Sequence, residues 1–415
     1  MNPMPVRRCA VPNALLLGLL LAPTAPAFEL PAGNTAASNS MPATLKQATD
    51  WLEKRSTQMI RDCRRKTKSG IAAFPPQVGG GYEAFWLRDY AYMLDGNLEA
   101  FTEAELKDSY RFLLAGQRDD GAMVDCIKFD GTPIYMPGFG SIGANPVADG
   151  SQFMVSVAWR TFQRTRDTNL VSATVDALVK GMRAVPRDSA SGLVFIKPGT
   201  PLDRASYGFT DSIRKQGSEL FCSLLFVQAS RQLADLLDAA GRAAEARKWR
   251  GEASRVTESI RTVFWDGSLF RAATAVCNQP DIWGSVFAVF IGVATPEQAK
   301  AIAQYMKNNY SGIVKRGQLR HLPAGMYWES TDTPAGKYQN GAFWATPVGW
   351  FVYTLDLEDP GLADKTVIDM VRDFIATKDE NECINDGYVN VSHYIASVAL
   401  PLDGIRQMVN RRGRK

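Results

Sequence analysis

The chain has 415 residues, of which 46% are hydrophobic and 22% charged, as in an ordinary folded globular protein. Its 47 Lys and Arg residues nearly balance 43 Asp and Glu residues, which disfavours nucleic acid or an anionic membrane as a partner. Two histidines cannot form a three-histidine metal site, and their scarcity leaves acid–base chemistry mainly to carboxylates. The nine Trp, thirteen Tyr and twenty Phe residues offer flat apolar surfaces to a core or a ligand.

The first 27 residues have the pattern of a secretory signal. Two early arginines precede an apolar run over residues 14–22, and small residues at 25–27 have the spacing of a cleavage site. We expect removal of residues 1–27, a disordered leader over 28–42, and export to the periplasm or beyond. The apolar run is too short to span a bilayer, and we expect no later segment to span one. The exported chain then has 45 basic and 43 acidic residues, a net charge of +2.

Export would make disulfides possible, but the cysteine pattern does not suggest a disulfide framework. Removal of Cys9 with the signal leaves an odd number, and no two cysteines have the CxxC spacing of zinc or thioredoxin-like sites. We interpret the remaining cysteines as mostly buried small apolar residues: Cys63, Cys126, Cys222, Cys277 and Cys383.

From residue 43 onward, hydrophobic residues recur every three or four positions, which predicts helices, and strand-like alternation is short and rare. No Pro/Ser-rich linker or charge run divides this part of the chain, so we expect one domain over residues 43–412. The predicted helices lie near residues 43–66, 84–99, 102–117, 151–165, 168–184, 216–240, 242–263, 295–308, 341–356, 362–377 and 390–410.

Long loops rich in Gly, Pro and aromatic residues recur at about every second helix. They cover residues 74–82, 119–146, 186–209 and 312–340. Long irregular loops that recur in a compact domain usually carry function. The pattern predicts an all-α fold of the (α/α)6-barrel type, in which inner and outer helices alternate and the long loops gather at one mouth. A helical solenoid is the alternative, but no short repeat of fixed period is visible.

The first candidate site follows the glycine run at residues 79–81. Trp86 and Asp89 lie three residues apart and share a helix face, and Arg88 stands between them. An aromatic ring beside a carboxylate suits a sugar, because the ring stacks on the sugar while the carboxylate accepts hydrogen bonds from its hydroxyls. Pairing of Arg88 and Asp89 at the surface, without a ligand, is equally compatible with the spacing.

A second candidate site precedes the predicted helix at 216–240. Asp211 lies just ahead of this helix, where it either caps the helix or presents its carboxyl group to a cleft. Capping is the commoner role of an aspartate in this position. Glu219, about two turns further on, is a reserve carboxylate.

A third group, around residues 325–344, has polar amides framed by aromatic residues: Gln339 and Asn340 with Trp344, and Glu329 as a reserve carboxylate. A fourth, around residues 380–388, contains Glu380, Glu382 and Tyr388 ahead of the last helix. Aromatic helix starts more often belong to a core than to a site. However, all four groups occupy equivalent places, in loops that lead into alternate helices.

The order of these motifs resembles that of the six-hairpin, or (α/α)6-toroid, glycosidases. Trp86-Leu87-Arg88-Asp89 is similar to the W-x-R-D found near the start of several of these families. The segment 209–214, followed by Leu233–Leu236, resembles the GLDNSPR…LA.LA pattern of glycoside hydrolase family 63. Gly341–Trp344 looks like the RGPVW or NGPFW helix start of that group, and residues 380–387 are similar to its late YENY…TG segment.

This resemblance covers most of residues 43–410 and implies a role for particular carboxylates. The general acid of family 63 corresponds to Asp211, and the general base comes from the late segment, where Glu382 fits better than Glu380. Thr210 departs from the pattern because an acidic residue is expected before Asp211.

The resemblance implies an inverting glycoside hydrolase, which we expect to act as an exo-enzyme on an oligosaccharide or polysaccharide. One carboxyl group protonates the leaving oxygen and an opposed carboxylate, roughly 6.5–9.5 Å away, activates water. We assign Asp211 as the acid and Glu382 as the base. The residues expected to hold or wall in the sugar are Trp86, Arg88, Asp89, Gln339, Asn340, Trp344 and Tyr388. No metal or cofactor is expected, and we expect a monomer.

One feature of the sequence opposes the assignment of the acid. Arg214 and Lys215 would lower the pKa of Asp211, whereas a general acid needs a raised pKa. The two cations must therefore point away from Asp211, or burial must outweigh them. If they point at it, Glu219 becomes the better acid.

Other functions fit the same scaffold. A polysaccharide lyase or unsaturated-uronyl hydrolase would need a Tyr or His base and an arginine clamp for a uronate. A sugar epimerase or isomerase would depend on paired histidines, and only His321 and His393 are available. A non-catalytic saccharide-binding protein is the third alternative, and it would be indifferent to loss of Asp211 or Glu382.

Overall fold

The computed structural model describes residues 41–135, 147–199 and 212–414. Residues Met41–Lys415 form one compact unit. The predicted signal (1–27), nearly all of the predicted leader, and Asp211 lie outside the described residues.

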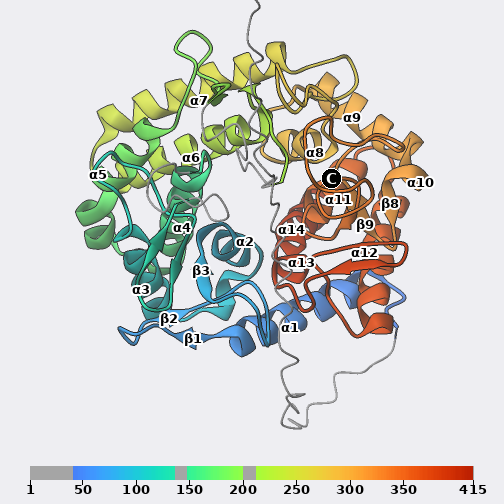
Figure 1. Cartoon of the computed structure of the whole chain (residues 1–415), viewed down its shortest axis with the longest axis horizontal. Coiled ribbons are helices and arrows are strands. Elements are labelled where there is room, and N and C mark those ends of the chain that lie inside the picture. The colour runs from blue at the N-terminus through green and yellow to red at the C-terminus, as the bar shows by residue number, and fades with distance from the viewer. Residues whose placement is uncertain (1–40, 136–146, 200–211, 415) are drawn as a thin grey trace, which may run out of the picture. The chain divides into compact units, whose positions relative to one another are not determined.

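The inner layer of this unit is a closed ring of helices (Figure 1). Helix α2 packs on α4, α4 on α6, α6 on α8, α8 on α11 and α11 on α14, which returns to α2. The short helix α13 leads directly into α14 and also packs on α2. The inner helices are α2 (Leu87–Asn97), α4 (Gly150–Thr165), α6 (Leu220–Ala239), α8 (Ile282–Phe290), α11 (Val348–Leu355), α13 (Ala396–Ala399) and α14 (Pro401–Arg412).

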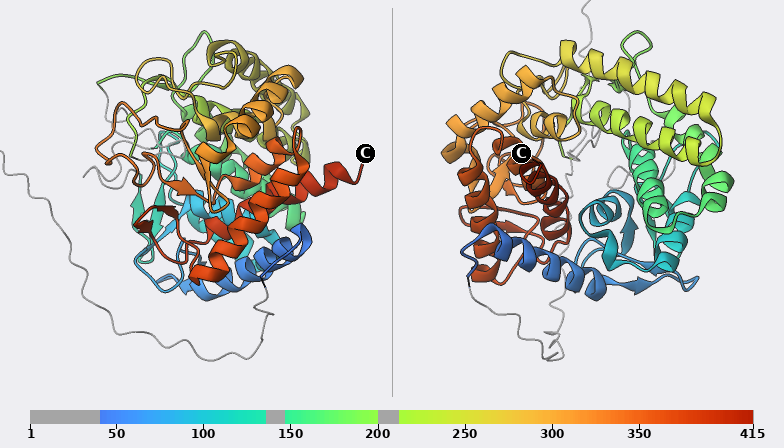
Figure 2. Two further views of the ribbon diagram at one scale, coloured as in Figure 1. Left: turned by 90° about the vertical axis from the view of Figure 1, so that its right-hand side faces the viewer. Right: turned by 180° about the vertical axis from the view of Figure 1, so that it is seen from behind.

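The outer helices alternate with the inner ones along the chain and surround them (Figure 2). Helix α1 packs against α12, which brings the first and last outer helices together. This is the predicted (α/α)6 barrel. The outer helices are α1 (Leu45–Cys63), α3 (Glu103–Leu114), α5 (Thr168–Ala184), α7 (Ala243–Val263), α9 (Pro296–Asn308) and α12 (Pro360–Thr377); the short α10 (Tyr310–Ile313) and the 3-10 helix η1 (Leu98–Ala100) lie in connections.

Burial distinguishes the two layers. Helix α6 buries fifteen of its twenty residues, whereas α7 buries six of twenty-one along one stripe. An outer helix therefore shows the amphipathic period that makes it recognisable in the sequence. Helix α8 is buried along nearly its whole length and has no polar face, which explains why the periodicity did not predict it.

The inner helix α6 also corrects one expectation about membranes. By length and composition Leu220–Ala239 could cross a bilayer, contrary to the expectation that no segment after the N-terminus could. However, 83% of its apolar window is buried inside the protein. Its hydrophobicity is accounted for by its place in the inner ring.

Short antiparallel strands lie in the connections that lead into inner helices. They explain why four predicted helices begin later than expected: residues near 84–86, 217–218, 343–344 and 388–390 pair as strands. The largest sheet has the order β12-β11-β10-β9-β8. Its strands are β8 (Val314–Lys315), β9 (Gln318–Arg320), β10 (Phe343–Trp344), β11 (Cys383–Asn385) and β12 (Tyr388–Asn390). The others are β1 (Arg65–Lys66) with β2 (Ala72–Ala73), β3 (Ala84–Trp86) with β4 (Cys126–Lys128) and β5 (Pro133–Ile134), and β6 (Phe195–Ile196) with β7 (Gly217–Ser218).

The ring closes where glycines allow backbones to touch. A Cβ atom on Gly96 of α2 would lie 1.9 Å from the carbonyl oxygen of Ala399, and one on Gly404 of α14 would lie 2.1 Å from that of Gly349 in α11. Any side chain at Gly96 or Gly404 would therefore push the inner helices apart. The five cysteines after the predicted signal are buried and free, as the sequence suggested.

Candidate active site

The inner helices begin on one side of the ring, which we call the mouth. Arg88 in the first turn of α2 pairs with Asp149 at the start of α4. Tyr394, just before α13, donates a hydrogen bond to Asp89 of α2. The ring of Trp283 in α8 meets that of Trp344, which lies in the strand leading to α11. Residues far apart in the sequence therefore converge at the mouth through their places at helix starts.

The mouth contains a pocket of about 140 Å³. Three segments form its wall: the β3–α2 junction, the residues before and within β10, and the residues around β11 and β12. The lining side chains are Tyr82, Trp86, Arg88, Asp89, Tyr92, Tyr338, Gln339, Trp344, Glu382 and Tyr394. The wall combines two carboxylates with several aromatic rings.

Arg88 is held in place by a buried partner. Its guanidinium donates to Asp149 Oδ2 from Nη2 at 2.8 Å and from Nε at 3.2 Å. Asp149 is 1% exposed, and burial raises its pKa although Arg88 opposes the shift. Arg88 also lies over the ring of Phe153. The cation is thus fixed at the pocket wall rather than free to follow a ligand.

Asp89 receives a short hydrogen bond from another residue of the pocket wall. Tyr394 Oη donates to Asp89 Oδ1 at 2.6 Å, and both side chains are at least nine-tenths buried. Burial, and next the charge of Asp89, raise the pKa of Tyr394 well above its usual value. Tyr394 therefore remains a protonated donor, and Asp89 is an acceptor with a fixed orientation.

Glu382 is 4% exposed and immediately precedes β11. Its Oε2 accepts a hydrogen bond of 2.7 Å from Asn390 Nδ2. Strand β11 pairs with β10, so the sheet places Glu382 beside Trp344 in the wall of the same pocket.

Aromatic rings form much of the remaining wall. Tyr82 and Trp86 meet edge to face with ring centres 5.7 Å apart. Trp344 donates from Nε1 to the carbonyl oxygen of Tyr338 at 3.2 Å, which fixes its indole. The indole Nε1 of Trp86 is buried and has no hydrogen-bond partner among the described residues. A ligand with hydroxyl groups and an apolar face would suit such a wall.

Of the described residues that the sequence assigns to catalysis or sugar binding, leaving the reserve carboxylates aside, six line the pocket and two lie outside it. Asn340 supports its own loop, because it accepts from the backbone N–H of Trp328 and donates to the carbonyl oxygen of Thr333, both at 2.8 Å. Tyr388 lies on β12 beneath the ammonium group of Lys337. The six in the pocket are Trp86, Arg88, Asp89, Gln339, Trp344 and Glu382.

None of the three reserve carboxylates lines this pocket. Glu219 is fully buried, and its two oxygens accept from Lys215 Nζ and the backbone N–H of Cys222, each at 2.6 Å. Both oxygens of Glu219 are therefore engaged by donors outside the pocket. Glu329 accepts from the backbone N–H of Cys277.

Glu380 binds Arg55 and His393 rather than facing the pocket. Arg55 donates to Oε1 at 2.7 Å and to Oε2 at 2.9 Å, and His393 Nδ1 lies 3.1 Å from Oε2. Burial alone would raise the pKa of Glu380, but the hydrogen bonds from His393 and Arg55 hold it below its usual value. With Asp379, these carboxylate and imidazole atoms lie within 4.8 Å of one another, as in a metal site. The guanidinium of Arg55 already supplies the positive charge there.

The two cations that opposed Asp211 as an acid are engaged elsewhere. Arg214 pairs with Asp332, and Lys215 is buried in its pair with Glu219. Ser212, the first described residue after Asp211, donates from its backbone N–H and its hydroxyl to Gln339 Oε1, at 2.9 and 2.8 Å. The chain is therefore tied to the pocket wall where it resumes after Asp211.

The pocket also contains tyrosines, and residues that hold its charged groups, that the sequence patterns did not indicate. Asp149 immediately precedes α4, and Tyr394 lies two residues before α13. A search for polar residues just before every inner helix would have found both. Asn390 gave no such signal, because only pairing of β11 with β12 brings it to Glu382.

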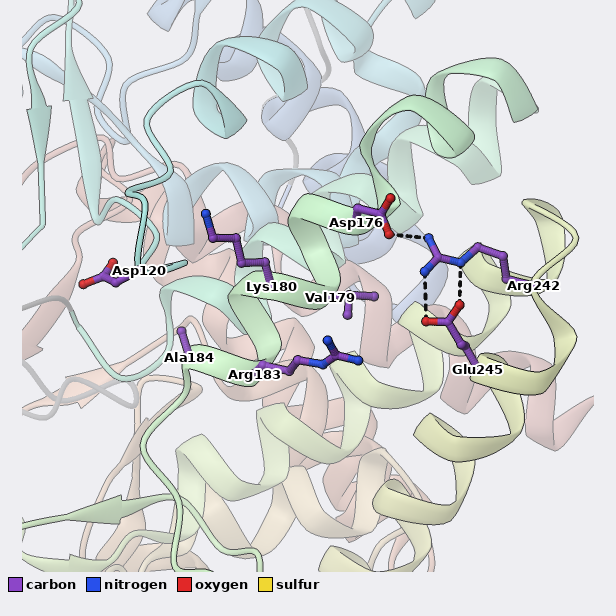
Figure 3. A pocket seen from close by; sticks show the side chains of 8 residues that line it. All are labelled: Asp120, Asp176, Val179, Lys180, Arg183, Ala184, Arg242 and Glu245. Carbon is purple, nitrogen blue, oxygen red and sulfur yellow. Dashed lines mark hydrogen bonds and ion pairs between the residues drawn. The ribbon is translucent and has the colours of Figure 1, made fainter.

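A larger hollow lies on the outside of the ring, between α5 and the start of α7 (Figure 3). It encloses about 440 Å³ and has no aromatic ring in its wall. Its Arg242 is already paired with Asp176 and Glu245. The hollow has no aromatic stacking surface and two of its three carboxylates are paired with Arg242, so we place the candidate active site at the mouth.

No protein-family model and no curated protein sequence matches the chain. Solved structures do. A mannosylglycerate hydrolase of glycoside hydrolase family 63 from Thermus thermophilus, in complex with glucose, is 16% identical with a TM-score of 0.58, covering 85% of this chain and 99% of that one. A rhamnosidase from Klebsiella oxytoca with rhamnose bound is also 16% identical at a TM-score of 0.58, covering 90% and 66%.

A family 78 rhamnosidase from a Bacillus species is 15% identical with a TM-score of 0.58 and covers 86% of this chain. The present chain spans about a third of that protein, or 34% of its length. These likenesses establish the fold: the chain is a six-hairpin toroid of the kind found in these glycosidases.

Proposed function

We propose that the protein is an exported glycoside hydrolase that acts on an oligosaccharide or polysaccharide with inversion at the anomeric carbon. The observation that carries the proposal is the pocket at the mouth, where Asp89 and Glu382 lie among aromatic rings and fixed polar groups. Carboxylates and stacking rings are the equipment of glycosidases. The toroid shared with solved glycosidases supports the same conclusion.

In the proposed reaction, Glu382 accepts a proton from water as the water oxygen bonds to the anomeric carbon. The glycosidic bond breaks, its electrons pass to the leaving oxygen, and a carboxylic acid protonates that oxygen. We assign the acid to Asp211. Two observations support this choice: Arg214 and Lys215 pair with other carboxylates, and the chain resumes beside Gln339 at Ser212.

Asp89 and Arg88 are assigned to the hydroxyl groups of the terminal sugar. Both side chains have fixed orientations, set by Tyr394 and Asp149 respectively. Fixed partners reduce the entropy lost when a ligand binds. The pocket volume of about 140 Å³ is well below the 300–1,000 Å³ or so of pockets for drug-sized ligands. A single terminal sugar fits this space better than the middle of a chain, which supports exo action.

The test is incubation with a panel of α- and β-linked oligosaccharides, with released sugar and its anomer followed by proton NMR. We expect one terminal sugar to be released with inverted configuration. Glu382→Gln and Asp211→Asn should abolish turnover and leave binding of the sugar intact. Retained configuration would overturn the inverting mechanism, and unchanged turnover in Glu382→Gln would overturn the base.

A uronate lyase is the second candidate, because tyrosines and Arg88 line the pocket. Two observations weigh against it. Arg88 is paired with buried Asp149, and the raised pKa of Tyr394 makes that tyrosine a poor base. A lyase would create an unsaturated product with ultraviolet absorbance, so absorbance assays on polyuronates separate the two reactions.

A further inference from the structure

The hairpin formed by β11 and β12 ties Asn390 to Glu382 through main chain as well as side chain. The backbone N–H of Glu382 donates to the carbonyl oxygens of both Asn390 and Val391, at 3.0 and 2.9 Å. These hydrogen bonds extend the pairing of the hairpin, in which Asn390 stands opposite Cys383, the next residue after Glu382. The Asn390 amide lies 2.7 Å from Glu382 Oε2.

The backbone after Asn390 adopts a conformation that its residues do not favour. Val391 has φ of 41° and His393 has φ of 51°, both in the left-handed region. This region is costly for a β-branched residue such as valine. Strain of this kind persists only where the surroundings impose it, and it is concentrated at functional sites.

Contacts with residues 379–380 impose that conformation. The backbone N–H of His393 donates to Asp379 Oδ1 at 2.9 Å, and that of Tyr394 donates to the carbonyl oxygen of Glu380 at 2.8 Å. Glu380 is held in turn by Arg55 of α1. The segment that carries Asn390 is therefore anchored at its far end to an outer helix.

We propose that Asn390 is a positioning residue for Glu382, an inference that rests on the proposed role of Glu382 as general base. The amide of Asn390 is a donor toward Oε2, so it favours the ionised carboxylate and fixes its plane. The base then meets the attacking water ionised and in one orientation. Asn390 itself touches neither water nor sugar in this scheme.

The kinetic test uses Asn390→Ala in the full chain, with Val389→Ala as the matched control. Val389 is 62% exposed on the same strand, and its pairing partner is Ile384 rather than Glu382. We expect Asn390→Ala to lower kcat about tenfold with little change in KM. In a plot of kcat against pH, it should raise the pKa of the acidic limb by about 1.

A second measurement does not depend on turnover. Carbon-13 NMR of protein labelled at the glutamate carboxyl carbons gives the pKa of Glu382, with Glu382→Gln to assign its signal. We expect Asn390→Ala to raise this pKa by about 1, Asn390→Asp to raise it further by charge repulsion, and Val389→Ala to leave it unchanged. Asn390→Ser, which keeps a hydroxyl donor, serves if the alanine variant does not fold.

The outcomes separate the two proposals. If neither the carboxyl pKa nor the acidic limb moves in a folded Asn390 variant, Asn390 has no positioning role. If the pKa of Glu382 moves but the wild-type protein hydrolyses no saccharide, the contact is real and the proposed hydrolase function is wrong.

Discussion

Asp89 and Glu382 each accept a hydrogen bond from one short segment, residues 388–395, through Tyr394 and Asn390. The two carboxylates come from opposite ends of the chain, so this segment sets their relative orientation. At the residue scale, the site is therefore defined as much by the donors as by the carboxylates themselves.

The first prediction concerns Asp89. Its replacement by Asn keeps the shape of the side chain but removes a charged acceptor for sugar hydroxyls, and a hydrogen bond to a charged group is worth about 1.5–3 kcal/mol. We expect Asp89→Asn to lower kcat/KM roughly tenfold to a hundredfold at unchanged thermal stability. Steady-state kinetics on the sugar released in the panel assay check this. Tyr394→Phe should have a smaller effect, and an unchanged kcat/KM in Asp89→Asn would remove Asp89 from the binding site.

The second prediction concerns His393, which faces Glu380, Asp379 and Arg55. The hydrogen bond to Glu380 raises the pKa of His393 above its usual 6.5. A raised pKa means that the protonated form stabilises the fold, fully below about pH 6.5, and that this contribution is lost as pH rises through the higher value. The wild-type melting temperature should therefore fall as pH rises above 6.5.

The melting temperature of His393→Asn should not show the fall above pH 6.5 that is expected of the wild-type protein. Asparagine tolerates the left-handed backbone that His393 adopts, so the substitution tests the charge and not the turn. Calorimetry from pH 6 to pH 8 distinguishes the two proteins. Parallel curves would show that His393 does not stabilise the fold through its charge.

At the scale of elements, the inner ring depends on helices that approach more closely than side chains permit. A methyl group at Gly96 would overlap the carbonyl oxygen of Ala399. We expect Gly96→Ala to destabilise the protein by about 1–3 kcal/mol or more, as overpacked cores do. Gly251 in the outer helix α7 is the matched control, because nothing lies within 4 Å of its added methyl group. Gly251→Ala should stabilise the protein by about 0.5–1 kcal/mol in urea unfolding, and equal effects at the two sites would contradict the packing argument.

The elements also show where the sequence was informative. Outer helices such as α1 and α7 have one apolar stripe, and their periodicity predicted them within a few residues. Helix α8 has no polar face, so no periodicity predicts it. The hydrophobic pattern also predicts a helix from residue 341, where the structure has strand β10. Short strands at helix starts are fixed by pairing with distant segments, as Phe343 pairs with Arg320 and Ile384, and no local pattern records such partners.

At the scale of the whole molecule, the recurrence of long loops at about every second helix predicts the barrel. Inner and outer helices that alternate in a closed ring place such loops at one mouth. The candidate pocket could be predicted in part for the same reason: Trp86, Asp89 and Trp344 lie near helix starts, and Glu382 lies in the loop that leads to the last inner helices. Asn340 and Tyr388 have equally suitable side chains but support loops instead. Residue type and position could not distinguish a side chain that faces the pocket from one that packs behind it.

The last prediction concerns a buried group that joins three inner helices. Arg160 of α4 donates to Asp95 of α2 at 2.7 Å and reaches Asp403 of α14 at 3.4 Å. Burial raises the pKa of Asp403 to about 6, although Arg160 opposes the shift. Because this pKa is raised in the folded protein, protonation of Asp403 stabilises the fold. The contribution is complete below about pH 3.8 and is lost as pH rises through about 6.

Asp403→Asn should therefore flatten the decline of unfolding free energy between pH 4 and pH 6 and leave the protein at least as stable at pH 7. Urea unfolding across this range measures it. Asp386→Asn is the control, because Asp386 is 92% exposed in its pair with Lys315. A steeper decline in Asp403→Asn would show that the ionised carboxylate stabilises the ring.

The common orientation of the inner helices has an electrostatic consequence. Each helix carries about half a positive charge at its first turn, because its peptide dipoles are aligned. The first turn of α2 lies in the wall of the pocket that Asp89 and Glu382 line, and Asp149 immediately precedes the first turn of α4, so the positive ends of these two helices lie near the site. This field belongs to the backbone and does not depend on which side chains the loops carry. A positive backbone field favours an ionised carboxylate, such as the proposed base Glu382, whichever side chains the loops carry.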